Sequence, residues 1–482
     1  MNVLLVSTYE LGHQPFGLAS PARWLRELAV VASVRCVDLA VEQLADEDVA
    51  AADLIACYVP MHTATRLAAG VAARIRDLNP GAHLCFYGLY APMNESYLRR
   101  LGGNTILGGE FEEGLAALAR RIAQPAPDRG EPRPAGDAVA TAAAAQPEPV
   151  VSLARQSFLV PDRAGLPDLS RYARLIDADG TEKKTGYTEA TRGCKHTCRH
   201  CPIVPVYGGR FRVVQRDVVL ADIENLVQAG AEHITFGDPD FFNGPAHAIG
   251  LVTALHERFP RVSYDVTIKV EHLVRHAEHV PALAATGCLM VTSAVESFDD
   301  HVLTILDKRH TKADFIQASR TLAAAGIAMN PTFVAFTPYG SIDSYIDFLD
   351  TIRDTGMVPN VAPVQYAIRL LLPQGSLLLD LPETRQALTG FDEHSLCHRW
   401  AHPDPRMDQL QAELTSFVAD VGEASREEVF SGVLRRSLRA AGRENEFVPV
   451  DPAAATSAVP RLDEPWYCCA EPTEGQLAAL GL

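Results

Sequence analysis

Residues 191–210 read TRGCKHTCRHCPIVPVYGGR and place three cysteines, Cys194, Cys198 and Cys201, within eight residues. Two histidines, His196 and His200, lie between them. The start of the chain, MNVLLVSTYELG, has no basic residues before its apolar stretch and predicts a first β-strand, not a signal peptide. Ten cysteines without an export signal argue for a reducing cytoplasm and against a disulfide framework, so this loop is a candidate metal site.

Two metals fit the cysteine loop differently. Zinc usually takes four ligands, often as two pairs separated by a longer loop, and the close histidines would crowd a tetrahedral site here. A 4Fe–4S cluster held by three cysteines leaves one iron open, as a substrate-binding cluster requires. The spacing favours iron–sulfur and leaves zinc as the alternative.

Strand-like and helix-like segments alternate from about residue 185. Six strand candidates follow one another: GYTEATRG (186–193), HITFGD (233–238), SYDVTIKV (263–270), LMVTSAVE (289–296), AMNPTFVAF (328–336) and NVAPVQYAIRL (360–370). Glycines fall where intervening helices should stop: Gly230, Gly287, Gly326 and Gly356. We expect a partial parallel barrel of six βα units over 151–380, with its chemistry at the carboxyl ends of the strands. The cysteine loop begins directly after the first strand.

The remaining chain is predicted to form three further regions. Residues 1–123 contain five short apolar runs (NVLLVS, VRCVDL, DLIACYV, HLCFYG and NTILGG) separated by helical patterns, which predicts a doubly wound, flavodoxin-like α/β domain. Residues 124–150 are rich in Pro and Ala and predict a linker. Residues 381–482 are predicted to be mostly helical and to end in the loop-like DEPWYCCAEP.

Composition excludes some partners. The net charge is −17, without a long basic run, which argues against nucleic acid as the main substrate. No apolar stretch approaches the roughly 20 residues of a membrane span. We therefore expect a cytoplasmic enzyme that acts on a small molecule.

CxxxCxxC in the loop after the first strand of repeated βα units resembles the radical S-adenosylmethionine superfamily, over about residues 185–375. The resemblance implies that Cys194, Cys198 and Cys201 hold a 4Fe–4S cluster. Its open iron would chelate the amino and carboxylate groups of S-adenosylmethionine. Electron transfer, from a reductant such as flavodoxin or ferredoxin, would then cleave a carbon–sulfur bond and give a carbon radical.

The stretch FGDPDF follows the second strand and includes Gly237, Asp238 and Asp240. It lies where the superfamily places acceptors for the amino group of the cosubstrate, and carboxylates suit an ammonium donor. The later PTFVAFTPYGS departs from the glycine-rich fifth-strand pattern of relatives, so contacts to the ribose or adenine are not assigned there.

VESFDDHVLTILDKRHT resembles a second superfamily pattern and marks Glu296 and Ser297 at the end of the fourth strand. Lys308 or Arg309 would then meet the carboxylate of the cosubstrate. The alternative is that these residues only form helix caps and surface salt bridges. Their order at successive strand ends favours the functional interpretation.

A doubly wound domain ahead of such a core resembles the cobalamin-binding class of the superfamily. The usual ligand motif is Asp-x-His-x-x-Gly after the first strand. Here the loop reads YELGHQPFGLAS, with His13 four residues before Gly17 and no matching Asp. His13 is the candidate cobalt ligand, His62 is a candidate to line the crevice, and both have the alternative of ordinary loop or cap histidines.

The ending CCAEP, with Cys468 and Cys469, resembles a subgroup with CUAEP or CCAEP tails, some of whose members carry selenocysteine at the second position. Adjacent cysteines form only a strained disulfide ring. The pair therefore suits chelation of a soft ion, redox transfer or delivery of a thiolate to the active site. Two buried thiols without a role are the alternative, and Cys397 is a candidate third partner.

Three functions remain open. The first is a transferase that moves a carbon fragment from S-adenosylmethionine to a substrate handled by Cys468 and Cys469. The fragment is methyl with cobalamin; without it, a 3-amino-3-carboxypropyl group delivered to a thiophilic acceptor such as trivalent arsenic is a candidate. The second is a methylthiotransferase or RNA-modifying enzyme, which predicts a basic appendage that this acidic chain lacks. The third is a non-enzymatic iron–sulfur or metalloid sensor, which leaves Asp238 and Glu296 unexplained.

Overall fold

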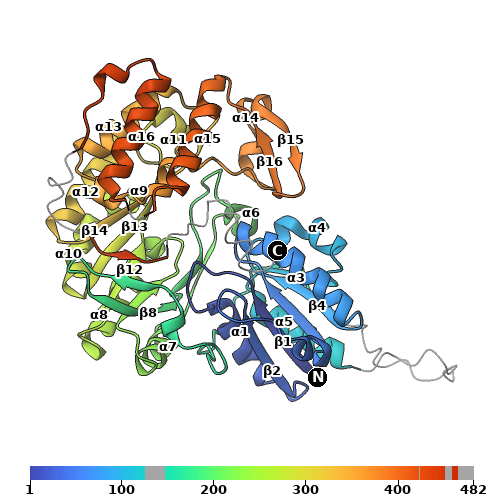
Figure 1. Cartoon of the computed structure of the whole chain (residues 1–482). Coiled ribbons are helices and arrows are strands. Elements are labelled where there is room, and N and C mark those ends of the chain that lie inside the picture. Colours follow the sequence, from blue (N-terminus) through green and yellow to red (C-terminus); the bar gives the residue numbers. More distant parts are fainter. Residues whose placement is uncertain (125–146, 423, 451–458, 465–482) are drawn as a thin grey trace, which may run out of the picture. The chain divides into compact units, whose positions relative to one another are not determined.

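A computed structural model of the chain describes residues 1–124, 147–422, 424–450 and 459–464. Its contacts divide the chain into two units. Within the described ranges, unit 1 contains residues 1–10 and 15–166, and unit 2 contains residues 11–14 and those from 167 onward. Most of the predicted linker and the tail cysteines Cys468 and Cys469 lie outside the described residues. Each unit is described by itself, with the labels of Figure 1.

Unit 1 is built on a parallel sheet with strand order β2-β1-β3-β4-β5-β6. The strands are β1 (Asn2–Ser7), β2 (Ser33–Asp38), β3 (Leu54–Tyr58), β4 (His83–Tyr87), β5 (Thr105–Gly109) and β6 (Val151–Ser152). The five predicted strands are thus present. Strand order reverses between β1 and β3, so the loops after these two strands flank the topological switch point, where ligands of such sheets bind.

Helices cover both faces of this sheet, which explains the apolar strands. They are α1 (Phe16–Arg26), α2 (Asp46–Ala51), α3 (His62–Leu78), η1 (Pro92–Asn94), α4 (Glu95–Arg100) and α5 (Phe111–Ala123). One core joins one face of the sheet to α1 and α5, with Leu18 and Leu115 fully buried. A second core joins the other face to α3 and α4, with Ile75 and Leu98 fully buried.

Unit 2 is built on a seven-stranded sheet with the order β14-β13-β12-β11-β8-β7-β17. The strands β8 (Glu182–Thr188), β11 (His233–Phe236), β12 (Ser263–Thr267), β13 (Cys288–Glu296) and β14 (Ala328–Phe333) run parallel. At one edge β7 (Arg174–Ile176) and β17 (Arg461–Leu462) pair antiparallel. Two short strands, β9 (Thr191–Gly193) and β10 (Phe211–Val213), form a separate ladder.

The helices of unit 2 follow the predicted alternation with the strands. The α-helices are α6 (Val204–Tyr207), α7 (Arg216–Gln228), α8 (Pro245–Arg258), α9 (Val270–Arg275), α10 (Val280–Ala285), α11 (Asp300–Ile305), α12 (Lys312–Ala324), α13 (Ile342–Asp354), α14 (Pro382–Ala387), α15 (Pro405–Ala419) and α16 (Arg426–Ala440). The 3-10 turns are η2 (Leu169–Arg171), η3 (Phe241–Asn243), η4 (Ala277–His279), η5 (Val358–Asn360), η6 (Pro363–Tyr366), η7 (Leu377–Asp380) and η8 (Glu444–Glu446). The glycines predicted to stop helices, Gly230, Gly287, Gly326 and Gly356, all have φ between +69° and +98°. Such values are strained for other residues, so glycine ends these helices for a conformational reason.

One prediction for unit 2 is wrong. Residues 360–370 do not form a sixth strand; they form η6 and a single parallel bridge between Phe336 and Arg369. Pro359 and Pro363 have no N–H to donate to a ladder, which explains the loss. Between α14 and α15, β15 (Leu388–Asp392) and β16 (Cys397–Trp400) form an antiparallel hairpin in a region that is otherwise mostly helical in its described residues.

Among the described residues, no helix is both long and apolar enough to cross a lipid bilayer.

Candidate active site

The cysteine loop is closed at its base by the β9–β10 ladder, which pairs Gly193 with Phe211. Gly193, directly before Cys194, has φ +72°. A Cβ atom at this position would lie 2.6 Å from the carbonyl oxygen of Arg210. The sequence therefore needs glycine here, both for the left-handed backbone and for the close approach of the returning chain.

The three thiols of the loop lie in a protected place. Cys194 and Cys198 are buried and Cys201 is half-buried. All the cysteines that the structure describes are free of disulfides. Burial and the neighbouring thiols raise the pKa of Cys201 to about 12, and burial raises that of Cys194 to about 11. Metal ligation removes such protons outright, and the ammonium of Lys269, 3.5 Å from Sγ of Cys198, offsets the resulting charge. The donor set fits a cluster held by three thiolates.

Asn243, at the end of η3, holds the start of the loop. Its Oδ1 accepts the backbone N–H of Lys195 at 3.1 Å, and its Nδ2 donates to the carbonyl of Gly193 at 3.3 Å. Nζ of Lys195 donates to the carbonyl of Phe242 at 3.5 Å. The loop after β11 thus fixes the backbone on both sides of Cys194.

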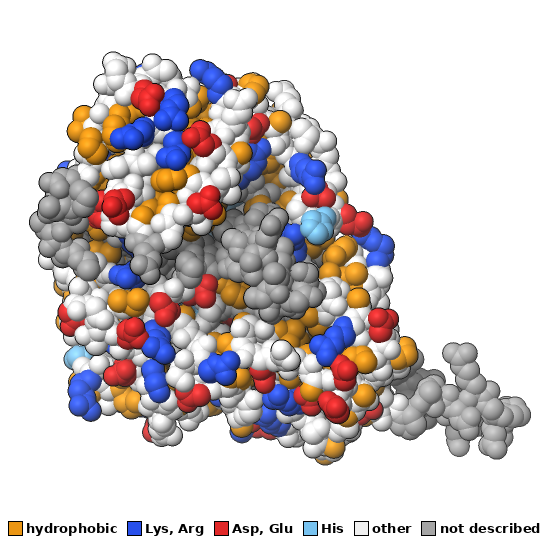
Figure 2. Space-filling model, in the orientation of Figure 1, with side chains coloured by type: hydrophobic (Ala, Val, Ile, Leu, Met, Phe, Trp, Pro, Cys, Tyr) orange, Lys and Arg blue, Asp and Glu red, His pale blue; other side chains and the backbone are white. Residues whose placement is uncertain are grey.

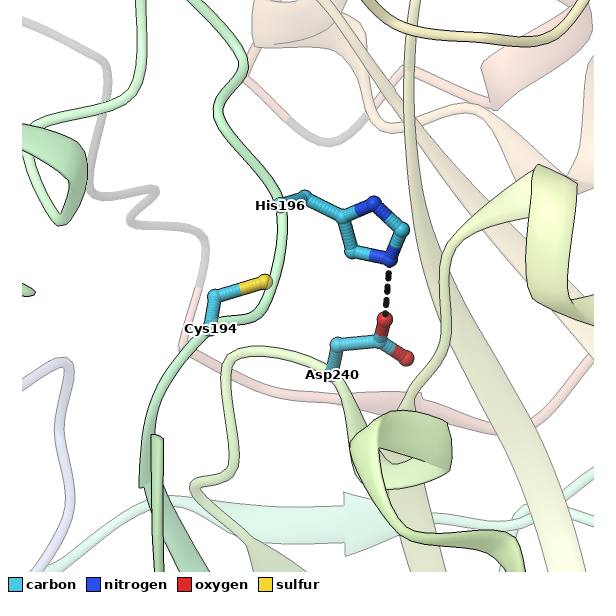
Figure 3. Close-up of side chains that lie close together, drawn as sticks. All are labelled: Cys194, His196 and Asp240. Carbon is cyan, nitrogen blue, oxygen red and sulfur yellow. Dashed lines mark ion pairs between the residues drawn. The ribbon is translucent and has the colours of Figure 1, made fainter. Parts of the chain in front are cut away.

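His196 points toward Asp240, with Cys194 beside it (Figure 3). Its Nε2 lies 3.6 Å from Oδ2 of Asp240 and 3.1 Å from Nε2 of His272, which comes from α9. Nδ1 of His272 lies 2.6 Å from the same Oδ2. Burial and the charge of Lys269 lower the pKa of His196 to about 3, so its imidazole is neutral.

Gly237 and Asp238 follow β11, as the sequence predicts for cosubstrate contacts. A Cβ atom at Gly237 would lie 1.9 Å from the hydroxyl of Tyr187, so no side chain fits. Oδ1 of Asp238 accepts the backbone N–H of Ala190 at 2.8 Å, and Oδ2 accepts the hydroxyl of Thr191 at 2.5 Å. Burial nevertheless raises the pKa of Asp238 to about 7, so a cation bound beside it would favour the charged form.

Glu296, the last residue of β13, receives two cationic or donor side chains. Its Oε1 lies 3.2 Å from Nζ of Lys308 and 3.0 Å from Nε2 of His200, the second histidine of the cysteine loop. These two neighbours outweigh burial and hold its pKa at about 2. Glu296 has φ +70°, an uncommon conformation for a residue other than glycine. Lys308 is thus paired within the protein.

The other predicted residues at this strand end serve local structure in the part of the chain that is described. The hydroxyl of Ser297 accepts the backbone N–H of Asp299 at 3.0 Å. Arg309 lies 3.4 Å from Asp307 and is exposed.

The sequence interpretation missed three residues of the site, Lys269, Glu271 and His272. They lie at the start of α9, directly after β12, in the stretch KVEHLVRHAEH. The signal was available, because charged and imidazole side chains at the carboxyl end of a barrel strand are candidates for chemistry.

At the switch point of unit 1, two buried hydroxyls have no hydrogen-bond partner among the described residues: Oγ of Ser7 and Oγ1 of Thr63. Ser7 ends β1, and Thr63 lies in the first turn of α3, beside the fully buried His62. Buried polar groups are normally satisfied, so this place suits a ligand with polar groups.

His13 belongs to the short segment 11–14, which groups with unit 2. Its ring stacks on Tyr187 with 4.8 Å between centroids, and burial lowers its pKa to about 4. Its role as a cobalt ligand stays a prediction. Cys397 is buried in β16, and the proposed partnership with the tail cysteines is likewise untested.

Comparison with known proteins assigns the core. Residues 188–355 match the family model of the Radical SAM superfamily. This range begins at the end of β8 and includes the three cysteines, Asp238 and Glu296. The chain therefore carries a radical S-adenosylmethionine domain and is an enzyme of this type, with a 4Fe–4S cluster and S-adenosylmethionine as its cofactors.

The chain is also similar in fold to two solved enzymes. One is the radical S-adenosylmethionine methyltransferase TsrM from Kitasatospora setae, with 16% identity, a TM-score of 0.62, and coverage of 91% of this chain and 95% of that chain. The other is the cobalamin-dependent S-adenosylmethionine radical enzyme OxsB, with 13% identity, a TM-score of 0.62, and coverage of 94% and 77%.

A curated relative by sequence is tRNA-2-methylthio-N(6)-dimethylallyladenosine synthase from Sorangium cellulosum, 24% identical over 222 residues. The match covers 41% of this chain and 44% of the synthase, less than half the length of either.

Proposed function

We propose that this enzyme transfers a carbon fragment of S-adenosylmethionine, a methyl or a 3-amino-3-carboxypropyl group, to a small-molecule acceptor. The observation that carries the proposal is the position of the cysteine loop. Contacts from the ends of β11, β12 and β13 hold the loop directly beside Asp238 and the Glu296–Lys308 pair. Loop and strand ends together form one polar site.

A 4Fe–4S cluster held by Cys194, Cys198 and Cys201 would, when reduced, supply the electron for cleavage of a carbon–sulfur bond of S-adenosylmethionine. Around the cluster, side chains of the protein bind and orient the cosubstrate. The carboxylate of Asp238 is an acceptor for the ammonium of the cosubstrate. Lys308 is the predicted partner of its carboxylate, and Glu296 holds the ammonium of Lys308 in place until then. A reductant such as flavodoxin or ferredoxin is expected.

Unit 1 is proposed to bind cobalamin, in which case the fragment is methyl. The unsatisfied hydroxyls of Ser7 and Thr63 at the switch point support this proposal. The fold likeness to OxsB, which was solved with aqua-cobalamin, and to TsrM, which was solved with cobalamin and a 4Fe–4S cluster, also supports it.

For the acceptor we propose a substrate handled by the vicinal thiols Cys468 and Cys469, which lie outside the described residues. Two adjacent thiolates chelate soft ions, so trivalent arsenic is the acceptor class to test first, with the aminocarboxypropyl group as the fragment. This part of the proposal comes from the chemistry of the CCAEP tail.

A methylthiotransferase is the second candidate, favoured by the match to the tRNA-modifying synthase. On the face shown in Figure 2, Lys and Arg side chains alternate with Asp and Glu, so the described residues of this face form no continuous basic stripe. Together with the net charge of −17, this supports a small-molecule acceptor over tRNA. A non-enzymatic sensor is not retained, since the chain carries the enzyme domain.

The test is anaerobic reconstitution of the full chain. We expect roughly four irons per chain, lost in Cys198→Ala and retained in Cys36→Ala, the control in unit 1. S-adenosylmethionine and dithionite are then added with and without cobalamin or arsenite. Formation of methylated acceptor with cobalamin supports methyl transfer; methylthioadenosine with arsenite supports aminocarboxypropyl transfer.

Three further outcomes separate the parts of this proposal. If the double variant Cys468→Ser/Cys469→Ser cleaves S-adenosylmethionine and forms product as the wild type does, the tail thiols have no part in the reaction. Loss of retained cobalamin, or of its ligand-dependent absorption, in His13→Ala would support the predicted cobalt ligand. If the chain holds an intact cluster and transfers neither a methyl nor an aminocarboxypropyl group, the proposed transferase function is wrong.

A further inference from the structure

The ammonium of Lys269 is buried against the cysteine loop. Its Nζ donates to Sγ of Cys198 at 3.5 Å, and the residue is only 6% exposed. A lysine is rarely buried unless a partner satisfies its charge. The thiolate that Cys198 offers to a 4Fe–4S cluster is such a partner, so this lysine suits the loop in its cluster-binding form.

The backbone of Lys269 is held on both sides, which fixes the point from which its side chain starts. The N–H of the preceding Ile268 donates to the carbonyl of Thr292 in β13 at 2.9 Å. The carbonyl of Lys269 accepts the N–H of His272 at 2.9 Å, in the first turn of α9. The ammonium therefore reaches Cys198 from a rigid junction between β12 and α9.

Glu271 balances this charge only in part. Its Oε2 lies 3.5 Å from Nζ of Lys269 and 3.5 Å from Nδ1 of His196. The carboxylate side chain is 20% exposed, so water screens it, whereas Glu296 is buried and meets Lys308 at 3.2 Å. The charge of Lys269 is therefore less compensated than that of Lys308.

A fixed positive charge beside a cluster ligand favours the reduced state of the cluster. One-electron reduction makes and breaks no bond, and it adds one negative charge to the cluster. An ammonium that is hydrogen-bonded to a ligand sulfur stabilises the added charge, and burial strengthens the attraction. Net charge and hydrogen bonds to the sulfurs are among the properties that set the reduction potentials of iron–sulfur clusters.

We propose that Lys269 and Glu271 together set the reduction potential of the 4Fe–4S cluster. Lys269 raises the potential through Cys198, and Glu271 limits the rise by opposing the charge of the ammonium. Neither residue has to contact S-adenosylmethionine for this role. The higher potential allows a weaker reductant to load the cluster with its electron.

The competing role for Lys269 is to bind the carboxylate of S-adenosylmethionine, which the sequence assigns to Lys308 or Arg309. An ammonium has three N–H donors, so a contact with the cosubstrate would not by itself remove the donor to Cys198. The two roles are separated by measuring the potential without the cosubstrate, because the contact between Lys269 and Cys198 is then the one that is tested.

The test is a potentiometric titration of the reconstituted full chain, without S-adenosylmethionine or acceptor, in which electron paramagnetic resonance reports the reduced cluster. In Lys269→Met the ratio of reduced to oxidised cluster at a fixed potential should fall about tenfold, the value of one hydrogen bond to a charged group. For one electron this is a shift of about 59 mV to a more negative potential. Lys269→Arg keeps the charge and should stay close to the wild type.

Glu271→Gln removes the opposing charge and should shift the potential in the other direction, to a less negative value. Lys195→Met is the matched control, because the ammonium of Lys195 belongs to the same loop but donates to the carbonyls of Phe242 and Asn243, at 3.5 and 3.4 Å. Since this half-buried charge contacts no sulfur and is screened by water, the control should change the ratio by less than about threefold.

Three results overturn the proposal. If Lys269→Met and Glu271→Gln keep the wild-type potential, or shift it in the same direction, their charges do not set it. If Lys269→Met weakens S-adenosylmethionine binding at an unchanged potential, Lys269 belongs to the carboxylate of the cosubstrate. If Lys269→Met binds fewer than roughly four irons, Glu271→Gln decides, because it leaves the ammonium in place, and an unchanged potential there contradicts the proposal.

The titration contains neither cosubstrate nor acceptor, so its outcome is independent of whether the proposed transfer reaction is correct.

Discussion

Nε2 of His200 lies 3.0 Å from Oε1 of Glu296, although the two residues are 96 positions apart. His200 stands between the second and third cysteines, and Glu296 ends β13. The same oxygen lies 3.2 Å from the ammonium of Lys308. One carboxylate therefore joins the cysteine loop to the strand end that is predicted to contact the cosubstrate.

Glu296→Gln should lower the free energy of unfolding by about 3–5 kcal/mol, because it leaves the buried ammonium of Lys308 without its charged partner. Chemical denaturation of the cluster-free chain measures this. Asp350→Asn, which removes an exposed ion pair to Arg353, should cost less than about 1 kcal/mol. Equal effects of the two changes would show that the Glu296 pair is no stronger than a surface pair.

The stability of the cluster-free chain should fall below pH 4.5 through Glu296. Its pKa is about 2 in the folded chain against an ordinary value of 4.5. The folded state then binds fewer protons than the unfolded state between these values, so stability is lost as pH falls through that window. The loss amounts to about 3 kcal/mol. Denaturation midpoints compared between wild type and Glu296→Gln should differ in slope there, and parallel curves would contradict the assignment.

Gly193→Ala should sharply reduce the iron bound after reconstitution, because the new Cβ collides with the carbonyl of Arg210 and displaces Cys194. Gly180→Ala is the control: it also has positive φ, at +84°, but nothing lies within 4 Å of a Cβ there. In Gly180→Ala the free energy of unfolding should fall only by the roughly 1–2 kcal/mol that a left-handed backbone costs a residue other than glycine, and the irons should be retained. Iron lost equally from both would point to general destabilisation.

Ser7→Ala and Thr63→Val should each weaken cobalamin binding about fivefold, the value of one ordinary hydrogen bond. Titration followed by cobalamin absorption gives the dissociation constants. Ser33→Ala, at the opposite end of the unit 1 sheet, should leave them unchanged. If the two switch-point variants bind as wild type, the unsatisfied hydroxyls do not face the cofactor.

Much of the fold could be predicted from the sequence, because local patterns indicate most of its strands and helix ends. Apolar runs of six or seven residues predict the strands of unit 1, and Gly230, Gly287, Gly326 and Gly356 mark helix ends through their positive φ. The antiparallel pairing of β17 with β7 joins residues 285 or more positions apart, which no local period encodes. The lost sixth strand was signalled by its prolines and was still misjudged.

The candidate site, like the fold, was predicted only where the sequence carries a local signal. The cysteine spacing predicts the cluster ligands, and FGDPDF marks the loop that the structure places against the start of the cysteine loop. Which neighbour each side chain meets was not predictable, because His196 and His200 differ by only four positions yet meet carboxylates from different strands. His272 was missed although its place directly after β12, at the carboxyl end of a strand, made it a candidate.

Two opposite requirements meet at position 296: the left-handed backbone favours glycine, and the neighbouring side chains favour a carboxylate. Its φ of +70° favours glycine by about 1–2 kcal/mol, while Lys308 and His200 require a carboxylate. Substitution of Glu296 by glycine would relieve the backbone strain but leave the buried ammonium of Lys308 without a charged partner. We therefore expect Glu296 to be replaced only when His200 and Lys308 are replaced as well. In related chains, residues at the positions of 200, 296 and 308 should therefore change as a set, and a lone glycine at 296 would identify a member that lacks this pairing.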